Sequence, residues 1–266
     1  MSHPPEWYNG QSKDQWNQKA LFWDEMHGDA GNWFHKTLVE PSVLQLLELQ
    51  AGEKVLDLAC GNGVLARRCS QLGAVVTACD FSDALIRLAK ARSSSCIEYQ
   101  VVDATDKDAL LALGKFDAIS CTMALMDIST IEPLFQAVPQ MLNPGGRLVV
   151  STAHPAFNSN NPVFVAELSD EAGALKVQHS LKLSSYFNIP PVLSMGAKKE
   201  PCAHFYYHRT LQEMLMPAFS TGQLFLDAFL EPTFPPEVAA PMQLKCWVNT
   251  PTIPPVVTFR LRKLAL

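Results

Sequence analysis

The chain has 266 residues, of which 48% are hydrophobic and 18% charged, and its formal net charge is −5. This length suits one large α/β domain or two small ones, and the composition is that of an ordinary globular protein. The acidic balance gives no basic surface for nucleic acid or an anionic membrane, so an RNA substrate is disfavoured. No apolar run approaches the roughly 20 residues that a membrane helix needs.

Cysteine usage and the N-terminus point to a reducing compartment. The chain has seven cysteines, and no two of them form a C-x-x-C pair. An odd number without that spacing fits neither a zinc site nor a disulfide framework. The first ten residues lack the basic, apolar and small-residue pattern of a signal peptide. We therefore expect a cytoplasmic protein.

The N-terminal 38 residues are rich in aromatic side chains and contain four of the five tryptophans. The pattern over residues 13–25 predicts a helix with Trp16, Ala20 and Trp23 near one face. This segment is either an arm packed on the core or a helical lid over the site, and Trp23 is a candidate substrate contact. A second helix is expected to begin at Pro41 and to end at Gly52.

Residues 55–63, VLDLACGNG, predict a buried strand that ends in a glycine loop, with a helix after it. Gly61 and Gly63 allow positive φ angles and the close approach of a ligand. The free N–H groups at the start of the following helix suit a carboxylate or a phosphate.

Two cofactor classes use such a loop. Gly61, Gly63 and Ala66 fit a loose G-x-G-x-x-A pattern, the dinucleotide fingerprint. Asp57, four residues before the first glycine, would repel a pyrophosphate and would suit an ammonium group. S-adenosylmethionine (SAM) has an α-amino group and a sulfonium but no phosphate, so Asp57 favours SAM. The plain alternative is that Asp57 braces the loop or caps the helix.

The VLDLACGNG segment resembles motif I of the class I SAM-dependent methyltransferases, closest to their UbiE-like, small-molecule (type 11/25-like) branch. Later motifs follow in family order, so the resemblance covers roughly residues 39–263. It implies an α/β, Rossmann-like fold with a doubly wound, seven-stranded, mostly parallel sheet whose last strand is antiparallel. It also implies that the methionine part of SAM is held by Asp57, Ala59, Gly61, Asn62 and Gly63.

The second and third strands each end in a carboxylate. Asp80 lies about 20 residues after the loop, where a ribose diol is gripped in SAM and NAD sites alike. Phe81 beside it can pack on an adenine, and Ser82 caps the next helix. The third strand, residues 97–102, is followed by Asp103 and Ala104, which match the family's adenine-binding position, although Asp106 and Asp108 lie nearby.

The fourth strand, residues 116–122, leads into a loop that in the family passes under the methyl group. Thr122 and Met123 are the expected cofactor contacts in this loop. The D/N-P-P-Y/F signature of DNA amino-methyltransferases is absent from it. A helix over residues 129–142 should kink or break at Pro139. An Asn-Pro-Gly-Gly turn then leads into a strand over residues 147–152.

His154 follows that strand directly, so we expect it at the carboxyl edge of the sheet, where ligands bind in open α/β folds. Its side chain titrates near working pH, which makes it the candidate general base. The alternative is a hydrogen-bonded loop histidine.

Residues 154–207 break the strand–helix rhythm and are interpreted as an insertion that covers the substrate, with Tyr186 as a candidate contact. Thr210 and Glu213 then form a capping box that opens a helix. The His208-Arg209 pair before this helix resembles a family feature that touches the substrate, although it could also brace the helix locally. Residues 223–231 and 256–264 are expected as a terminal antiparallel hairpin, joined by a long proline-rich connection over residues 232–255.

The whole chain is thus interpreted as a single domain, residues 1–266, with a lid over residues 1–38. We expect transfer of a methyl group from SAM to an O, N or C nucleophile of a small, uncharged or apolar molecule. Alternatives are an NAD(P)-dependent oxidoreductase, an RNA methyltransferase or a SAM-binding regulator. The protein should be a monomer or homodimer, with no metal, nucleic-acid or membrane partner.

Overall fold

The computed structural model of the chain describes residues 3–93, 96–235 and 247–264. Cys246 and much of the proline-rich connection lie outside this part. Within it, no helix combines the length and the apolar character needed to cross a membrane.

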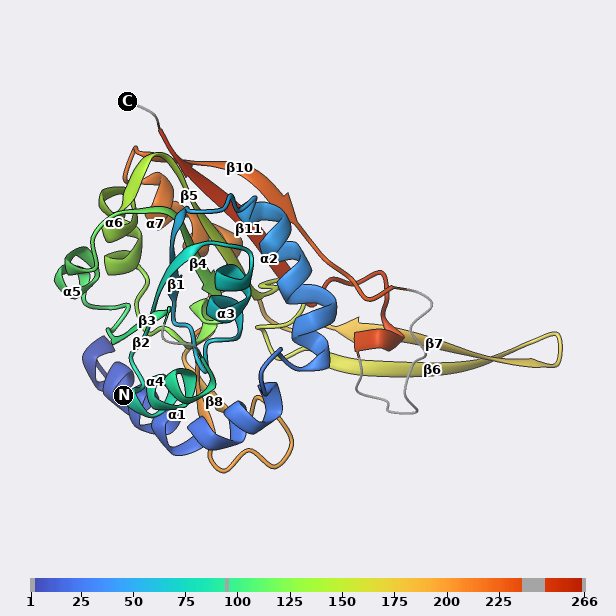
Figure 1. Cartoon of the computed structure of the whole chain (residues 1–266). Coiled ribbons are helices and arrows are strands. Elements are labelled where there is room, and N and C mark those ends of the chain that lie inside the picture. Colours follow the sequence, from blue (N-terminus) through green and yellow to red (C-terminus); the bar gives the residue numbers. More distant parts are fainter. Residues whose placement is uncertain (1–2, 94–95, 236–246, 265–266) are drawn as a thin grey trace.

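A seven-stranded sheet forms the centre of the molecule, with the strand order β10-β11-β5-β4-β1-β2-β3 (Figure 1). The five strands from β5 to β3 pair in parallel, while β11 runs antiparallel to both β5 and β10. The predicted sheet, its reversed last strand and the terminal hairpin are therefore confirmed. The strands are β1 (Lys54–Leu58), β2 (Val75–Asp80), β3 (Glu98–Val101), β4 (Phe116–Thr122), β5 (Leu142–Ala153), β10 (Leu224–Leu230) and β11 (Val256–Lys263).

Helices cover both faces of the sheet, each over its own apolar core. One core packs residues of α2, α3 and α4 against the sheet, and the other packs residues of α5, α6 and α7. Burial of near-continuous apolar strands between two helical layers is what a doubly wound parallel sheet requires. The helices are α2 (Glu40–Leu47), α3 (Val64–Gln71), α4 (Asp83–Arg92), α5 (Lys107–Ala112), α6 (Glu132–Met141) and α7 (Leu211–Phe219).

Several element boundaries differ from the prediction. The α2 helix ends at Glu48, which adopts a left-handed conformation, rather than at Gly52. The α6 helix retains Pro139 in its last turn and ends two residues later, so the proline limits the helix instead of breaking its middle. The Asn143–Gly146 stretch, expected as a turn, is part of the long strand β5.

The N-terminal helix α1 (Pro5–His27) is longer than expected and lies along α4 (Figure 1). The segment after β5 was expected to fold as a cover over the site, and this is only partly correct. Its β6 (Val163–Glu171) and β7 (Ala174–Lys182) form a two-stranded ribbon that extends away from the body (Figure 1). The short pair β8 (Val192–Ser194) and β9 (His204–Tyr206) lies against α1 instead.

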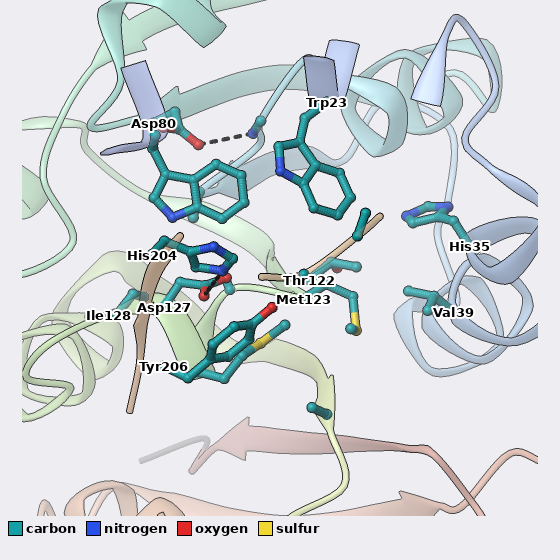
Figure 2. A pocket seen from close by; sticks show the side chains of 18 of the residues that line it. Trp23, His35, Val39, Asp80, Thr122, Met123, Asp127, Ile128, His204 and Tyr206 are labelled. Atoms are coloured by element: carbon teal, nitrogen blue, oxygen red, sulfur yellow. Dashed lines mark hydrogen bonds and ion pairs between the residues drawn. The ribbon is translucent and has the colours of Figure 1, made fainter. Parts of the chain in front are cut away.

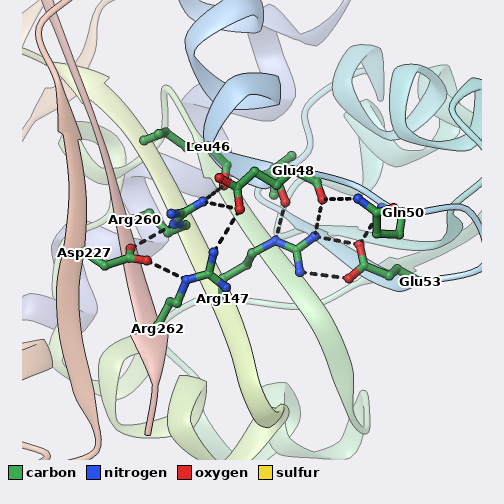
Figure 3. A network of polar contacts seen from close by, with 9 residues as sticks. Leu46, Glu48, Gln50, Glu53, Arg147, Asp227, Arg260 and Arg262 are labelled. Carbon is green, nitrogen blue, oxygen red and sulfur yellow. Dashed lines mark hydrogen bonds and ion pairs between the residues drawn. The ribbon is translucent and has the colours of Figure 1, made fainter.

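A polar network at the end of the sheet away from the glycine loop joins α2 to β5 and β11 (Figure 3). Arg147 of β5 makes a bidentate ion pair with Glu53, with N–O distances of 2.9 and 2.6 Å. Arg260 of β11 binds Asp227 of β10 and Glu48. The carboxylates neutralise the positive charges of these two buried arginines.

Candidate active site

A cavity of about 650 Å³ opens where β1, β2, β3 and β4 end. This is the carboxyl edge of the parallel strands, where open α/β folds bind ligands. Residues from α1, β8 and β9 close the other side of the cavity. Of the residues predicted to bind the cofactor, all except Gly63 line it: Asp57, Ala59, Gly61, Asn62, Asp80, Phe81, Asp103, Ala104, Thr122 and Met123.

The glycine loop after β1 has the backbone geometry that the sequence indicates. Ala59, Gly61 and Gly63 have φ angles of 55°, 56° and 78°. A Cβ atom on Gly63 would lie 2.3 Å from the Tyr99 hydroxyl oxygen, so this position has room only for glycine. Gly63 therefore allows the loop to pack closely against Tyr99, and α3 begins directly after it.

Asp57 lies at the end of β1 and is almost completely buried. Its Oδ1 accepts a hydrogen bond of 3.0 Å from the Ser120 hydroxyl, whereas Oδ2 is buried and has no hydrogen-bond partner among the described residues. Burial raises the pKa of this carboxyl to about 7, against the lowering effect of Ser120. A buried acceptor without a partner, beside a glycine loop, fits the ammonium group of an amino-acid moiety.

Asp80 ends β2 and faces the same cavity (Figure 2). Its two oxygens each accept one backbone N–H, from Gly61 and from Ser82, both at 2.9 Å. Each oxygen keeps a second lone pair, so the carboxylate can also accept from two hydroxyl groups of a ribose. Burial raises its pKa to about 6, and the two backbone hydrogen bonds oppose that shift.

Asp103 is held by the N-terminal helix, a contact that the sequence did not predict. The side chain of Asn9 in α1 donates to Asp103 Oδ2 at 2.7 Å, while Thr105 donates to Oδ1 at 2.8 Å. Asn9 itself lines the cavity. The helix α1 therefore contacts Asp103, the residue that the family resemblance assigns to adenine binding.

A second contact joins α1 to the glycine loop. Asn62 donates to Asp24 Oδ1 at 2.9 Å, and Asp24 also forms an ion pair with Arg92 of α4. The hydrogen bond from Arg92 keeps the pKa of Asp24 low, although burial of the carboxylate acts in the opposite direction. These contacts hold α1 against the glycine loop.

Arg209 holds the loop after β4 in place through hydrogen bonds to its backbone. This guanidinium donates to the backbone oxygens of Leu125, Ile128 and Ser129, at 2.7 to 3.0 Å. Arg209 is therefore engaged in positioning the loop and does not line the cavity, contrary to its predicted role in substrate binding. Met123 in this loop has a φ angle of 53°, and its side chain faces the cavity (Figure 2).

His154 does not have the geometry of a general base. It is buried and outside the cavity lining, and both ring nitrogens are occupied. Nδ1 accepts from the Ala156 amide at 3.1 Å, so Nε2 carries the hydrogen and donates to Glu231 at 2.8 Å. Burial lowers its pKa, against the effect of Glu231. Taking up a proton would break the Ala156 hydrogen bond, so the loop alternative is the better interpretation.

Tyr186 and His208 also lie away from the cavity, although both were predicted to contact the substrate. His208 Nε2 donates to the Tyr186 carbonyl oxygen, and its Nδ1 pairs with Ser159, both at 2.7 Å. The Tyr186 hydroxyl accepts from the Leu211 amide at the start of α7. Both side chains brace the junction between the inserted segment and α7.

The apolar half of the cavity is built largely by residues that the sequence did not single out. Trp23, predicted as a substrate contact, lines the cavity together with Trp16 of the same helix. Asp127, His204 and Tyr206 lie together beside Trp16 (Figure 2). Asp127 had a signal in the sequence, because it is the one acidic residue in an otherwise apolar and neutral loop; His204 had none.

The charge of the cavity lining is one-sided. Four carboxylates, those of Asp57, Asp80, Asp103 and Asp127, line it, and the described lining contains no lysine or arginine. Two histidines in the lining, His27 and His35, have pKa values lowered to about 4 by burial and are neutral at pH 7. Such a lining favours a cation and opposes a pyrophosphate. In the described part of the chain, no group of three or more His, Cys, Asp or Glu side chains is arranged to hold a metal.

The protein family described as a methyltransferase domain matches residues 55–146, which include the glycine loop, Asp80, Asp103 and Asp127. Residues 55–146 are thus similar to a methyltransferase domain. Curated relatives of the chain include a ubiquinone biosynthesis O-methyltransferase of Xanthomonas oryzae pv. oryzae, which is 36% identical over 105 residues. That alignment covers 38% of this chain and 44% of the relative, so the chain spans less than half the length of the curated relatives it matches.

Solved structures extend the likeness of fold beyond the matched segment of the methyltransferase domain. A SAM-dependent methyltransferase from Mesorhizobium loti has a TM-score of 0.63 at 22% identity, covering 84% of this chain and 96% of the other. The glycopeptide N-methyltransferase MtfA, in complex with SAM, has a TM-score of 0.52 at 15% identity, covering 84% and 92%. Neither the oxidoreductase nor the RNA-methyltransferase alternative finds support among these relatives.

Proposed function

We propose that the chain transfers a methyl group from SAM to a nucleophilic atom of a small molecule. The observation that carries this proposal is the cavity with four carboxylates and no lysine or arginine in its described lining. SAM brings two positive centres, the ammonium and the sulfonium, and carries no phosphate. The same lining would repel the pyrophosphate of NAD. Dinucleotide-binding Rossmann folds bind that group at a helix N-terminus.

The bound cofactor would supply an electrophilic methyl group, and the protein would hold the acceptor in line with it. Asp57 would take the ammonium on its buried Oδ2, and Asp80 would take the ribose hydroxyls. Asp103 with Ala104 would face the adenine edge, beside Phe81. Alignment of the reacting atoms in an enclosed site can supply roughly 7–11 kcal/mol of rate enhancement.

A small acceptor is favoured over a macromolecule by the shape and the charge of the site. The α1 helix covers the glycine loop through Asn62 and Asp24, and the lining offers no cation for a phosphate backbone. Single-domain organisation, the lid function of residues 1–38, a cytoplasmic location and a monomeric or dimeric state stay predictions from the sequence.

Calorimetry with SAM, S-adenosylhomocysteine and NAD tests the proposal. We expect binding of the first two ligands and none of NAD. The Asp80→Asn variant should bind SAM at least tenfold more weakly, because it loses a charged acceptor for two hydroxyl groups. Binding of NAD with no binding of SAM would contradict the proposal.

A further inference from the structure

A buried group of ionisable side chains lies beside the cavity. It consists of Lys19 from α1, Asp127 from the loop after β4, Glu200, and His204 from β9, and two of its members, Asp127 and His204, line the cavity. Each of them is at most 10% exposed at its side chain. Four ionisable groups buried together are costly to fold, so their retention points to a function.

The His204 ring lies between two carboxylates. Its Nε2 is 3.3 Å from Asp127 Oδ1, and its Nδ1 is 3.6 Å from Glu200 Oε1. His204 Nδ1 and Asp127 Oδ1 are nevertheless buried atoms without a formed hydrogen bond to any described residue. His154 differs on this point, since both of its ring nitrogens are used. His204 therefore keeps one ring nitrogen unsatisfied in a side chain that lines the cavity.

The surroundings hold this ring in place and balance its charge. Glu200 accepts from the Trp23 indole at 2.7 Å and pairs with Lys19 at 3.0 Å. The Lys19 ammonium also lies 3.9 Å from the centre of the Trp16 ring. With His204 neutral, the four groups sum to one negative charge. Protonation of His204 makes the sum zero, so this group is built to accept one proton.

The acceptor-binding space next to His204 is apolar and aromatic. The rings of Tyr206 and His204 are 4.4 Å apart, and Trp16 and Trp23 line the same region. A Cβ atom on Gly196 would lie 2.8 Å from the Tyr206 hydroxyl and 3.0 Å from Trp23, so a side chain there would narrow this region. An aromatic ring that carries a hydroxyl group fits these walls, with its ring on the indoles and its hydroxyl toward His204.

We propose that the methyl acceptor is an apolar, aromatic molecule with a weakly acidic hydroxyl group, and that His204, held by Asp127 and Glu200, takes the hydroxyl proton. This inference rests on the proposed function. The hydroxyl oxygen forms the new bond to the methyl carbon as the carbon–sulfur bond breaks, and the bond's electron pair stays on sulfur to give S-adenosylhomocysteine. The proton passes to Nδ1 of His204, and the imidazolium then lies between the two carboxylates.

The test uses the full chain, SAM and two matched acceptors, phenol and 4-nitrophenol, with formation of S-adenosylhomocysteine as the readout. At a pH where 4-nitrophenol is already ionised, only phenol needs a base. The His204→Gln variant should therefore lose about 100-fold or more in kcat/KM with phenol and only a few-fold with 4-nitrophenol. The His179→Gln variant, in the β6–β7 ribbon, is the control and should match the wild type with both.

Asp127→Asn provides a second, independent readout. Asp127, Glu200, Lys19 and Tyr206 are the titratable groups that face His204. Removing the negative charge of Asp127 should lower kcat/KM with phenol more than with 4-nitrophenol, whereas a purely structural role would lower both equally.

Equal losses with the two acceptors in His204→Gln, or no loss with either, would overturn the role of His204. A wild-type protein that binds SAM but methylates neither phenol nor 4-nitrophenol would overturn the acceptor class. The proposal that SAM is the cofactor would still stand. Failure to bind SAM would instead contradict the proposed function itself.

Discussion

Asn9 of α1 donates a 2.7 Å hydrogen bond to the carboxylate of Asp103, 94 residues further along the chain. The contact joins the N-terminal helix to the position that the resemblance gives to the adenine. We therefore expect Asn9→Ala to weaken SAM binding about fivefold, since one hydrogen bond to a charged group that fixes the cover is lost. Stopped-flow release of SAM should be faster by a similar factor.

The control for Asn9 is Gln18→Ala on the same helix, which should leave SAM release unchanged. If both variants behave alike, the effect belongs to the helix as a whole and the Asn9–Asp103 contact does not hold the cover.

The ionised Asp57 carboxylate should destabilise the ligand-free protein and strengthen SAM binding. Burial raises its folded-state pKa from 3.8 to about 7, above the value in the unfolded chain, so its ionisation lowers the stability of the ligand-free protein as pH rises from about 4 to 7. Asp57→Asn should therefore raise the ligand-free Tm at pH 8 and reduce the extra stabilisation by SAM. Thermal unfolding with and without SAM measures both effects, and a lower ligand-free Tm would contradict this account.

SAM affinity should depend on pH through the same carboxylates. The pKa of Asp57 is raised to about 7 and that of Asp80 to about 6, both chiefly by burial. A cation binds the ionised forms, so affinity should be constant above pH 7.5 and fall up to about tenfold per pH unit below 7. Calorimetry between pH 5.5 and 8 tests this, and in Asp57→Asn the fall should begin only near pH 6. A flat profile in the wild type would argue against ionised carboxylates in the site.

His154→Gln should affect stability and not chemistry. The imidazole joins the Ala156 amide to Glu231, and its loss should lower the free energy of unfolding by roughly 1–2 kcal/mol. Turnover per folded molecule, with phenol or 4-nitrophenol, should stay at the wild-type value. A hundredfold drop in kcat with unchanged stability would restore His154 as the base.

Gly63→Ala should destabilise the protein by about 2 kcal/mol or more. The residue has a φ angle of +78°, and a Cβ atom would lie 2.3 Å from the Tyr99 hydroxyl oxygen. Gly52→Ala, at φ +86° with open space around it, carries the backbone strain without the clash and should cost about 1 kcal/mol. Adding Tyr99→Phe to Gly63→Ala should recover part of the loss in urea unfolding, and no recovery would rule out the clash.

Local patterns in the sequence were sufficient where the determinant lies within a few residues. The α4 and β4 bounds, the Ser82 cap and the Thr210–Glu213 capping box follow from side chains that act on their own backbone. The carboxylates that follow the parallel strands were also readable, because parallel strands bring their carboxyl ends to one edge. The reversed last strand came from resemblance alone.

Tertiary packing decided which histidine faces the ligand. His154 follows the long strand β5 and His204 begins the short strand β9, and both lie next to carboxylates. The sequence favoured His154 for its position. The structure fills both His154 nitrogens and leaves His204 Nδ1 without a hydrogen-bond partner among the described residues. It brings Asp127 to His204, and Lys19 to the neighbouring Glu200, from segments far away in the chain.

By itself the sequence determined the alternating strands and helices, the glycine loop and the acidic residues that favour SAM, since each depends on spacing along one strand, helix or turn. Only the tertiary structure decided how α1 contacts Asp103 through Asn9 and the glycine loop through Asp24, and which ionisable side chains gather beside the cavity. Those contacts join residues far apart in the chain, and a side chain's position within its own element does not specify what another element brings to meet it.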